Sequence, residues 1–158
     1  MGGRRGTSAI RPISRRHINS LYVGLPLRRI YITHCSFKKD DSLRGTGSKV
    51  FPWELYVGQR IQAFMRHCRA RKVEWAVFSD LYGVWFPDVK HKWYEKHPGS
   101  VTKEEFEALL HGFNRQLSAY NEIWFYHHPK RLHPLYRKLL RVTRLRDRVR
   151  KFSHCHEI

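Results

Sequence analysis

Short apolar runs recur along this chain, separated by longer stretches in which polar residues interrupt the apolar ones. Three of the runs are rich in β-branched and aromatic residues, and a fourth, near the C-terminus, alternates between apolar and polar positions. Both patterns are typical of β-strands. The sequence therefore predicts strands at residues 29–34, 73–79, 123–126 and 148–154.

The stretches between these strands carry helical signals. Thr102 begins a capping box, and the apolar residues after it recur on one face of a helix. Pro52 and Pro134 suit the first turn of a helix, so we expect helices over 52–71 and 133–144. The apolar face of the helix after Thr102 would hold Phe106, Leu109, Leu110, Phe113, Leu117 and Tyr120.

Strands that alternate with helices are typical of α/β proteins with a parallel sheet. We therefore predict a three-layer α/β/α sandwich, flavodoxin-like or Rossmann-like, with a mainly parallel sheet of about four to five strands. Strands 29–34 and 123–126 are expected near the centre of that sheet. The intervening residues 35–52 and 80–100 are expected to form loops.

A single α/β domain over residues 29–158 accounts for all of these elements, and a chain of 158 residues is long enough for one core. Residues 1–28 are rich in arginine and contain no acidic residue. We interpret them as a flexible basic arm, although a transit peptide or an over-extended start would have the same composition.

The net charge is +18, from 31 lysines and arginines against 13 acidic residues. A charge of this size attracts polyanions, and the alternatives are nucleic acid, an anionic membrane surface and a merely solvated surface. The clustering of the charge favours a polyanion partner. No apolar run approaches the roughly 20 residues that a membrane span needs. Nucleic acid is the commonest polyanion in a cell, so the expected partner is nucleic acid and not a membrane.

The three cysteines, Cys35, Cys68 and Cys155, are few and odd in number. This argues against a disulfide framework and for a reducing compartment, so we expect a cytoplasmic protein.

In an open parallel sheet, ligands bind beyond the carboxyl ends of the strands. The segments that directly follow the predicted strands should therefore share one rim, and these are residues 35–39, 79–83, 127–131 and 154–156. The candidate ligand-binding residues, mostly from these segments, are Ser36, Lys38, Lys39, Tyr56, Tyr82, Gly83, His127 and His128.

Two rim residues are candidates for catalysis. Cys35 stands beside two lysines whose charges would favour its thiolate, so one interpretation is a nucleophile and the other is a small buried residue. Asp80 would act as a base or accept a hydrogen bond from the edge of a nucleobase, with Tyr82 stacked on the ring. The alternative for that segment is an Asx-type turn with packed aromatic residues, in which Gly83 supplies backbone freedom.

Other kinds of site are not favoured. Histidines and cysteines gather at residues 34–35, 127–128 and 154–156, but no pair has the tight spacing of zinc ligands, so we expect no metal. The stretch at 45–49 lacks the residue order of a P-loop, and no dinucleotide-binding glycine pattern follows the first strand. We therefore expect no cofactor.

A basic surface is predicted near the C-terminus, where residues 130–151 contain ten basic residues and one acidic residue. The helix after Pro134 would pack by Leu135, Leu139 and Val142 and present arginines to solvent. A cationic stripe of this kind suits contacts with a phosphate backbone. The candidate nucleic-acid-binding residues are Lys130, Arg131, Arg137, Arg141 and Arg144.

The rim motifs as a set resemble those of a widespread uncharacterised family of small α/β domains. That family carries a strand-terminal Ser-Cys-x-x-Lys-Lys, a Leu-Tyr on the next helix and a Ser-x-x-Tyr-Gly turn. The matching stretches here are Cys35-Ser36-x-Lys38-Lys39, Glu54-Leu55-Tyr56 and Ser79-Asp80-x-Tyr82-Gly83. The resemblance covers residues 29 to the C-terminus.

The first motif is also distantly similar to the Pro-Cys-x-x-x-Lys-Pro-Tyr segment of the archaeosine synthase core domain, a family that modifies a deazaguanine base in archaeal tRNA. In this chain Lys38-Lys39-Asp40 stands in place of the Lys-Pro-Tyr. The resemblance implies a nucleobase-related site on the rim and makes RNA a more expected partner than DNA.

These observations lead to a hypothesis of a nucleic-acid- or nucleotide-directed protein that acts in tRNA or RNA base modification. Two alternatives stay open: a non-catalytic RNA- or DNA-binding module, and a small-molecule phosphate-binding domain. The sequence does not decide whether the protein is an enzyme.

Overall fold

A five-stranded sheet forms the centre of the protein, whose computed structural model describes residues 26–158. Its strands are β1 (Arg29–His34), β3 (Trp75–Ser79), β4 (Gly83–Trp85), β6 (Glu122–Tyr126) and β7 (Val149–Phe152). They stand in the order β4-β3-β1-β6-β7. Four of them run parallel, and the edge strand β4 is antiparallel to β3.

The predicted α/β class with a mainly parallel sheet is confirmed. β1 is the central strand and pairs in parallel with both β3 and β6, as expected for residues 29–34 and 123–126. Every residue of β3 is buried, and so are the four inner residues of β1. Continuous apolar runs are needed here because helices cover both faces of a parallel sheet.

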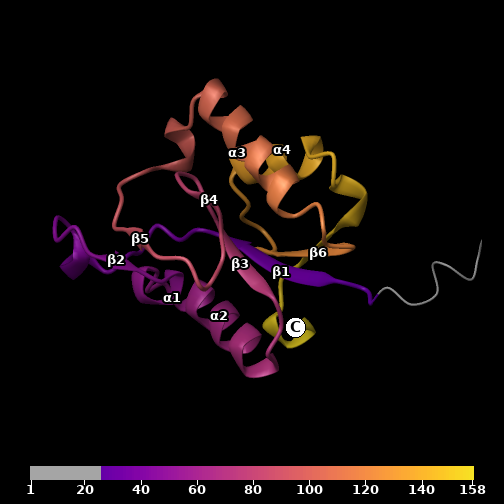
Figure 1. Ribbon diagram of the computed structural model, residues 1–158, viewed down its shortest axis with the longest axis horizontal. Helices are drawn as coiled ribbons and strands as arrows, with labels where there is room; N and C mark the ends of the chain where they lie inside the picture. Colours follow the sequence, from indigo (N-terminus) through magenta and orange to yellow (C-terminus); the bar gives the residue numbers. More distant parts are fainter. Residues whose placement is uncertain (1–25) are drawn as a thin grey trace, which may run out of the picture.

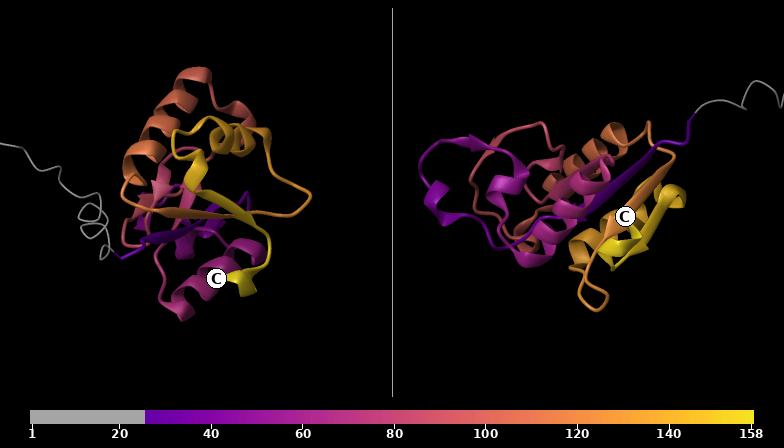
Figure 2. Two further views of the ribbon diagram at one scale, coloured as in Figure 1. Left: turned by 90° about the vertical axis from the view of Figure 1, so that its right-hand side faces the viewer. Right: turned by 90° about the horizontal axis from the view of Figure 1, so that it is seen from below.

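The helices are α1 (Pro52–Leu55), α2 (Gln59–Arg71), α3 (Lys103–Gln116) and α4 (Pro134–Val142). In Figure 1, α1 and α2 lie below the sheet together with the C-terminal turn Cys155–Glu157, whereas α3 and α4 lie above it. The view in the left half of Figure 2 shows the same division, with the sheet nearly edge-on between the helices. The sheet is therefore covered on both faces.

α3 begins where the sequence predicts. Oγ1 of Thr102 accepts a hydrogen bond from the N–H of Glu105 at 3.1 Å, which satisfies one of the free donors of the first turn. The buried residues of α3 are Phe106, Leu109 and Phe113, all on the predicted apolar face.

The single helix predicted over 52–71 is wrong, because residues 56–58 separate α1 from α2. An antiparallel bridge joins Tyr56 to Lys39. The N–H of Val57 donates to the carbonyl oxygen of Lys38 at 3.2 Å. Helical periodicity does not reveal such an interruption, since the competing hydrogen bonds come from another segment of the chain. The pairing fixes the lysine segment after β1 against the start of α2.

Some of the segments expected to be loops contain short strands. β2 (Lys49–Val50) and β5 (His91–Lys92) form an antiparallel pair apart from the main sheet, and β4 lies in the same expected loop as β5. Strands of two or three residues are too short to show a period, so pattern analysis misses them.

α4 and the last strand are shorter than predicted. α4 ends at Val142, so Arg144 lies beyond the helix. The buried side chains of α4 are those of Tyr136, Leu139 and Leu140. Val142, expected on the packed face, is 41% exposed, because the buried stripe is centred on Tyr136 instead.

The expected basic arm falls mostly on residues 1–25, which lie outside the described residues. Arg28, assigned to the arm by the sequence pattern, is joined to the domain. Its guanidinium pairs with Glu74 at 2.9 Å, and its backbone N–H donates to Oδ1 of Asn121 at 2.8 Å. The folded part therefore includes Arg28.

Within residues 26–158, none of the helices combines the length and the apolar character required to span a bilayer.

Gly83, the first residue of β4, has a φ of 73°, in the left-handed region. An added Cβ would find ordinary contact, 3.7 Å from Leu109, so the cost of a side chain there is backbone strain alone. We expect Gly83→Ala to lower the free energy of unfolding by about 1–2 kcal/mol in urea denaturation. Gly112→Ala, inside α3, is the matched control and should raise stability by about 0.5–1 kcal/mol. Equal effects of the two changes would contradict the strain at Gly83.

Candidate functional site

A cavity of about 270 Å³ opens at the carboxyl ends of β1 and β3, beside the N-terminus of α4. We call it the rim cavity. The chain leaves β1 for β3 on one side and later returns to β6 on the other, so the sheet order reverses across β1. This is where ligands bind in open parallel sheets. Its main lining residues are Cys35, Phe37, Lys39, Asp80, His97, His133 and Tyr136.

Cys35 is a buried thiol and not an activated one. Its Sγ atom lies 3.2 Å from the hydroxyl oxygen of Tyr136, and only 9% of the residue is exposed. Burial raises the pKa of Cys35 to about 11, and the negative charge of Asp80 adds to the rise. Burial thus opposes the thiolate that the neighbouring lysines are expected to favour.

Asp80 differs from the other groups of the site because it is a buried acid with an oxygen atom left unpartnered by residues 26–158. It is 2% exposed and lines the rim cavity, and its Oδ1 atom is buried without a hydrogen-bond partner among the described residues. Burial raises the pKa of the Asp80 carboxyl, against smaller opposing effects from Cys35, Lys39 and Tyr94. Perturbed acids in cavities of this kind are candidates for function.

The turn after β3 is held by Ser79 and not by Asp80. Oγ of Ser79 accepts hydrogen bonds from the N–H groups of Leu81 and Tyr82, at 3.1 and 3.0 Å. The predicted alternative, an Asx-type turn, would have used the carboxylate of Asp80 for this purpose. Because the serine hydroxyl does it instead, the Asp80 carboxylate is not what holds the turn.

A row of hydroxyl groups lies beneath the rim. The hydroxyl of Ser79 donates to that of Tyr94 at 3.1 Å, and the hydroxyls of Tyr94 and Tyr56 lie 2.7 Å apart. Tyr56 is fully buried, so the structure gives this candidate ligand-binding residue a packing role. The ammonium of Lys39 lies 4.5 Å from the centre of the Tyr94 ring, which holds it at the cavity.

Histidines form part of the cavity wall. His133 is the N-cap of α4, and its Nδ1 accepts the N–H of Leu135 at 3.1 Å. Burial lowers the pKa of His133, and neighbouring His97 lowers it further. The neutral ring therefore carries its proton on Nε2. His34 stacks on Tyr136 with ring centres 4.7 Å apart, and burial lowers its pKa as well.

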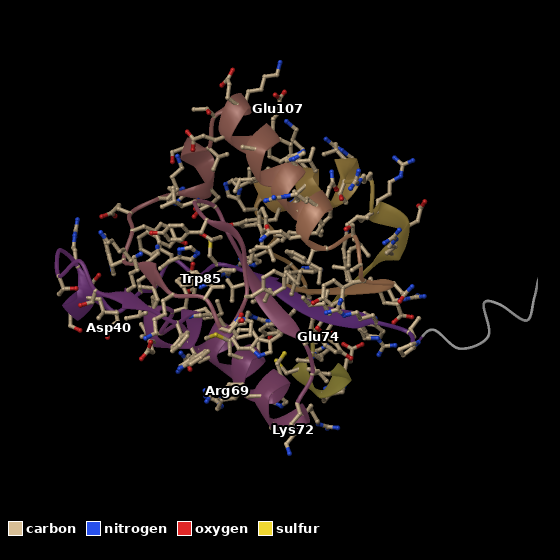
Figure 3. All side chains as sticks on the ribbon, in the orientation of Figure 1. Asp40, Arg69, Lys72, Glu74, Trp85 and Glu107 are labelled. Atoms are coloured by element: carbon tan, nitrogen blue, oxygen red, sulfur yellow. The ribbon has the colours of Figure 1, made fainter. Side chains whose placement is uncertain are left out.

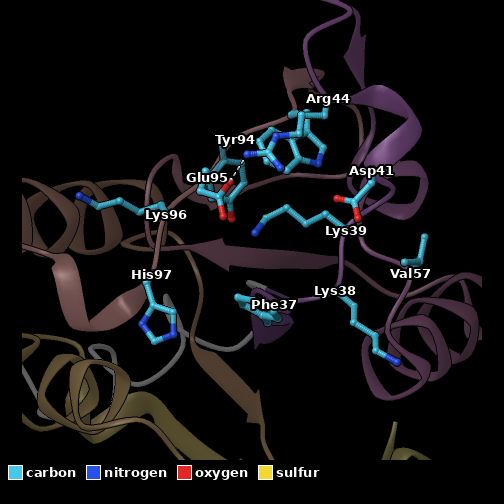
Figure 4. Close-up of a pocket in the computed structure, with 11 residues that line it drawn as sticks. Phe37, Lys38, Lys39, Asp41, Arg44, Val57, Tyr94, Glu95, Lys96 and His97 are labelled. Carbon is cyan, nitrogen blue, oxygen red and sulfur yellow. Dashed lines mark hydrogen bonds and ion pairs between the residues drawn. The ribbon is translucent and has the colours of Figure 1, made fainter.

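A wider groove of about 480 Å³ adjoins the rim cavity, and we call it the outer groove (Figure 4). The two share Phe37, Lys39, Lys96 and His97. Figure 4 shows Lys38 and Lys39 pointing in opposite directions, which explains why only Lys39 lines both spaces.

The cations of the outer groove differ in how they are neutralised. Lys96 pairs with Glu105 at 2.5 Å, and Arg44 pairs with Glu95 at 2.8 Å. Within residues 26–158, Lys38 and Lys39 form no ion pair with a carboxylate.

The other candidate ligand-binding residues lie around the rim cavity but do not all reach it. Ser36 lines it, and its Oγ accepts the N–H of Lys38 at 3.3 Å. Tyr82 lines a neighbouring pocket with Asp80 and Gly83, and one face of its ring is covered by His91, 3.9 Å away. The positive φ of Gly83 agrees with the predicted need for backbone freedom there.

His127 and His128 follow β6 and are half-buried, outside the residues that line the rim cavity. Nδ1 of His127 lies 2.7 Å from the carbonyl oxygen of His128, and Nδ1 of His128 accepts the N–H of Lys130. Both rings thus take part in holding their own loop.

The five candidate nucleic-acid-binding residues are all exposed. Arg137 donates to the carbonyl oxygen of Leu132 at 2.9 Å. In the part of the chain that the structure describes, none of the five pairs with a carboxylate. α4 therefore presents an uncompensated positive surface.

Sequence analysis missed several cavity residues, namely His97, Lys96, His133 and Tyr136. His133 carries a usable signal, because histidine before Pro134 at a helix start is placed to cap it. His97 and Lys96 come from a long connection whose course no local pattern predicts. Tyr136 was missed because the apolar stripe of α4 was assigned to Leu135, Leu139 and Val142.

Among residues 26–158, no group of three or more histidine, cysteine, aspartate or glutamate side chains is placed to hold a metal ion. Comparisons with protein-family models, with curated proteins and with solved structures found no match for this chain.

The three thiols should differ in reactivity. We expect iodoacetamide at neutral pH to modify Cys155 first, because it is half-exposed whereas Cys35 and Cys68 are buried. Burial raises the pKa of both buried thiols, so little thiolate is present. Peptide mass spectrometry over time checks the order, and unfolding in urea should make the three rates similar. A Cys35 that outpaces Cys155 would restore the nucleophile hypothesis.

The ionised carboxylate of Asp80 should lower the free energy of unfolding at neutral pH. Because its pKa is higher in the folded than in the unfolded state, ionised Asp80 disfavours folding, and protonation at acid pH removes this effect. We expect Asp80→Asn to raise the free energy of unfolding at pH 7 by about 1 kcal/mol or more. The gain should shrink as the pH falls towards about 4, the unfolded pKa. Urea denaturation across this range measures it, and a gain that does not depend on pH would refute the assignment.

Proposed function

We propose that this protein binds nucleic acid, RNA in preference to DNA, and that it presents the rim cavity to a nucleobase of the bound strand. The observation that carries the proposal is the double role of α4. His133 and Tyr136, at its start, line the rim cavity, while Arg137 and Arg141 on the same helix are exposed and form no ion pair with an acidic residue in the described chain. A strand held on the cationic side of α4 would pass the mouth of the cavity.

The electrostatics support a polyanion as the partner. The chain carries a net charge of +18, and among residues 26–158 the five candidate cations on and around α4 form no ion pair with a carboxylate. Phosphates contacted by such cations release condensed counterions, which drives association. A strand of nucleic acid offers phosphates in series and therefore suits several cations on one surface.

RNA base modification is the enzymatic form of this proposal. Asp80 would supply the acid–base group, since burial raises its pKa and its Oδ1 atom has no hydrogen-bond partner among the described residues. The high pKa of Cys35 favours acid–base chemistry at this site over attack by the thiol. A non-catalytic module would use the same surface and cavity for binding alone.

A second candidate is a small-molecule phosphate-binding domain, favoured by Lys38 and Lys39 beside the outer groove, which form no ion pair with a carboxylate of residues 26–158. The two functions differ in whether inorganic phosphate competes with the bound ligand. Inorganic phosphate should displace the ligand of such a domain, whereas it should act on nucleic acid only as any salt does.

Two finer proposals accompany this one. Helices on both faces of a mainly parallel sheet support a three-layer α/β/α sandwich of the flavodoxin-like or Rossmann-like kind. All three cysteines are unpaired, which supports a reducing compartment such as the cytoplasm.

Binding to RNA should be steeply salt-dependent. Each contacted phosphate should contribute a slope of about −0.7 on single strands, or about −0.9 on duplex DNA, in a log–log plot of affinity against salt. The triple change Arg137→Gln, Arg141→Gln, Arg144→Gln should flatten the slope by roughly 2–3 and weaken binding similarly for all sequences. The fold should survive, because the buried residues of α4 are untouched.

The matched control removes three charges from the other side of the sheet, by Arg66→Gln, Arg71→Gln and Lys72→Gln on and after α2. These residues are exposed, and Figure 3 shows Lys72 pointing away from the body of the protein at the end of α2. The control should leave the slope nearly unchanged. Fluorescence anisotropy at several salt concentrations measures both variants. No affinity for RNA at low salt, or equal losses in both triples, would refute a dedicated surface on α4.

A further inference from the structure

One oxygen atom of the buried Asp80 carboxylate lacks a hydrogen-bond donor among residues 26–158. Its Oδ1 atom has no hydrogen-bond partner within the described residues, although the residue is only 2% exposed. Buried polar groups in native proteins are nearly always paired, and an unpaired one calls for a specific explanation. Because Ser79 already holds the turn, local backbone geometry does not explain why a carboxylate stands here.

A ligand in the rim cavity would supply the missing donor. Asp80 lines that cavity, and no acidic or histidine cluster accompanies it that would make a metal site among residues 26–158. Such a ligand would offer an N–H or O–H group to Asp80. Two adjacent N–H groups would suit a carboxylate best, since its two oxygens accept in parallel.

The size and walls of the rim cavity limit what enters. At about 270 Å³ it is smaller than the roughly 300–1,000 Å³ usual for drug-sized ligands, so it fits one ring system. Its walls are aromatic: Tyr136, His133 and His97 line it, and the rings of the two histidines meet edge to face at 6.4 Å. Phe37 stands at the junction with the outer groove and is 79% exposed. Flat rings of this kind favour a planar heterocycle.

The mouth of the rim cavity provides a cation. Lys39 lines both the rim cavity and the outer groove, and its ammonium lies against Tyr94 with no carboxylate partner in the described chain. Lys96, which shares this position, is held by Glu105. Lys39 is thus the cation available to a negative group that leaves the cavity with the ligand.

Together these features define a nucleotide with a particular base. Guanine presents N1–H and an exocyclic amino group side by side, which matches a carboxylate. Adenine and cytosine each place a ring-nitrogen acceptor beside their amino group, and uracil places its single N–H between two carbonyls, so all three set a lone pair against Asp80. We propose that the rim cavity binds the guanine base of a nucleotide through Asp80 and places its phosphate beside Lys39.

This inference rests on the proposed function and names the base that the rim cavity takes. It requires no chemical step, because it concerns recognition alone. The nucleotide could be a residue of a bound strand or a free mononucleotide, and the probes below test the chemistry that both share.

The test is a titration of the full chain with mononucleotides, followed by isothermal calorimetry or by NMR. GMP should bind about tenfold or more tightly than IMP, which lacks only the 2-amino group, because one hydrogen bond to a charged acceptor is lost. AMP should bind more weakly than IMP, because it turns a ring-nitrogen acceptor towards the carboxylate. Similar affinities for the three nucleotides, or no binding of GMP, would overturn the proposal.

A change of specificity tests the role of Asp80 directly. Asp80→Asn keeps the shape of the side chain but turns one hydrogen-bond acceptor into a donor. It should therefore weaken the binding of GMP about tenfold or more and strengthen the binding of XMP, in which a carbonyl replaces the 2-amino group. A damaged fold cannot produce a gain for XMP. Asp88→Asn, an equal loss of charge at an exposed position away from the rim cavity, should leave both affinities unchanged. No gain for XMP would count against direct contact with Asp80.

Lys39→Gln provides a second measurement that does not depend on Asp80. The change should weaken the binding of GMP several-fold and leave the binding of guanosine, which has no phosphate, unaffected. An equal loss for both ligands would remove the phosphate assignment. If GMP fails to bind but RNA binding keeps its steep salt slope, only this inference falls. If RNA binding also fails, the proposed function falls with it.

Discussion

The parallel pairing of β1 with β3 and β6 is the constraint on which the site depends. Strands that run in the same direction end at the same edge, so Cys35 and Asp80, which are distant in the sequence, come to one rim. Helices on both faces bury the strands, and the loops at this edge are then the part of the sheet open to a ligand. The antiparallel edge strand β4 does not disturb this, because it only turns the chain back after Asp80.

Desolvation dominates the chemistry of the rim. It raises the pKa values of Cys35 and Asp80 and lowers those of His34 and His133, so each group is pushed towards its neutral form. What distinguishes Asp80 from the rest is that its burial is not compensated by a hydrogen bond to Oδ1 among the described residues. Stability given up at one buried polar group is a common feature of binding sites.

α4 connects the rim to the charged surface. Its packed side is anchored by Tyr136, whose hydroxyl lies against Cys35, while its exposed side carries arginines. A ligand that contacted both sides would therefore fit into the rim cavity and also be attracted by the positive charge of the surface. This combination couples a non-specific electrostatic attraction to a local, shape-selective contact.

The sequence by itself determined the α/β class, the central position of β1, the start of α3 at Thr102 and the meeting of the segments at 35–39 and 79–83 at one rim. These follow from local periodicity, capping chemistry and the rule that ligands bind at the carboxyl ends of parallel strands. The tertiary structure decided the rest. Whether Cys35 is activated or buried depends on the neighbours that desolvate it, and the break between α1 and α2 depends on hydrogen bonds from residues 38–40. The arrival of His97 and Lys96 at the rim cavity depends on the path of a long connection. Each of these is set by contacts between segments far apart in the chain, and local sequence patterns do not encode such contacts.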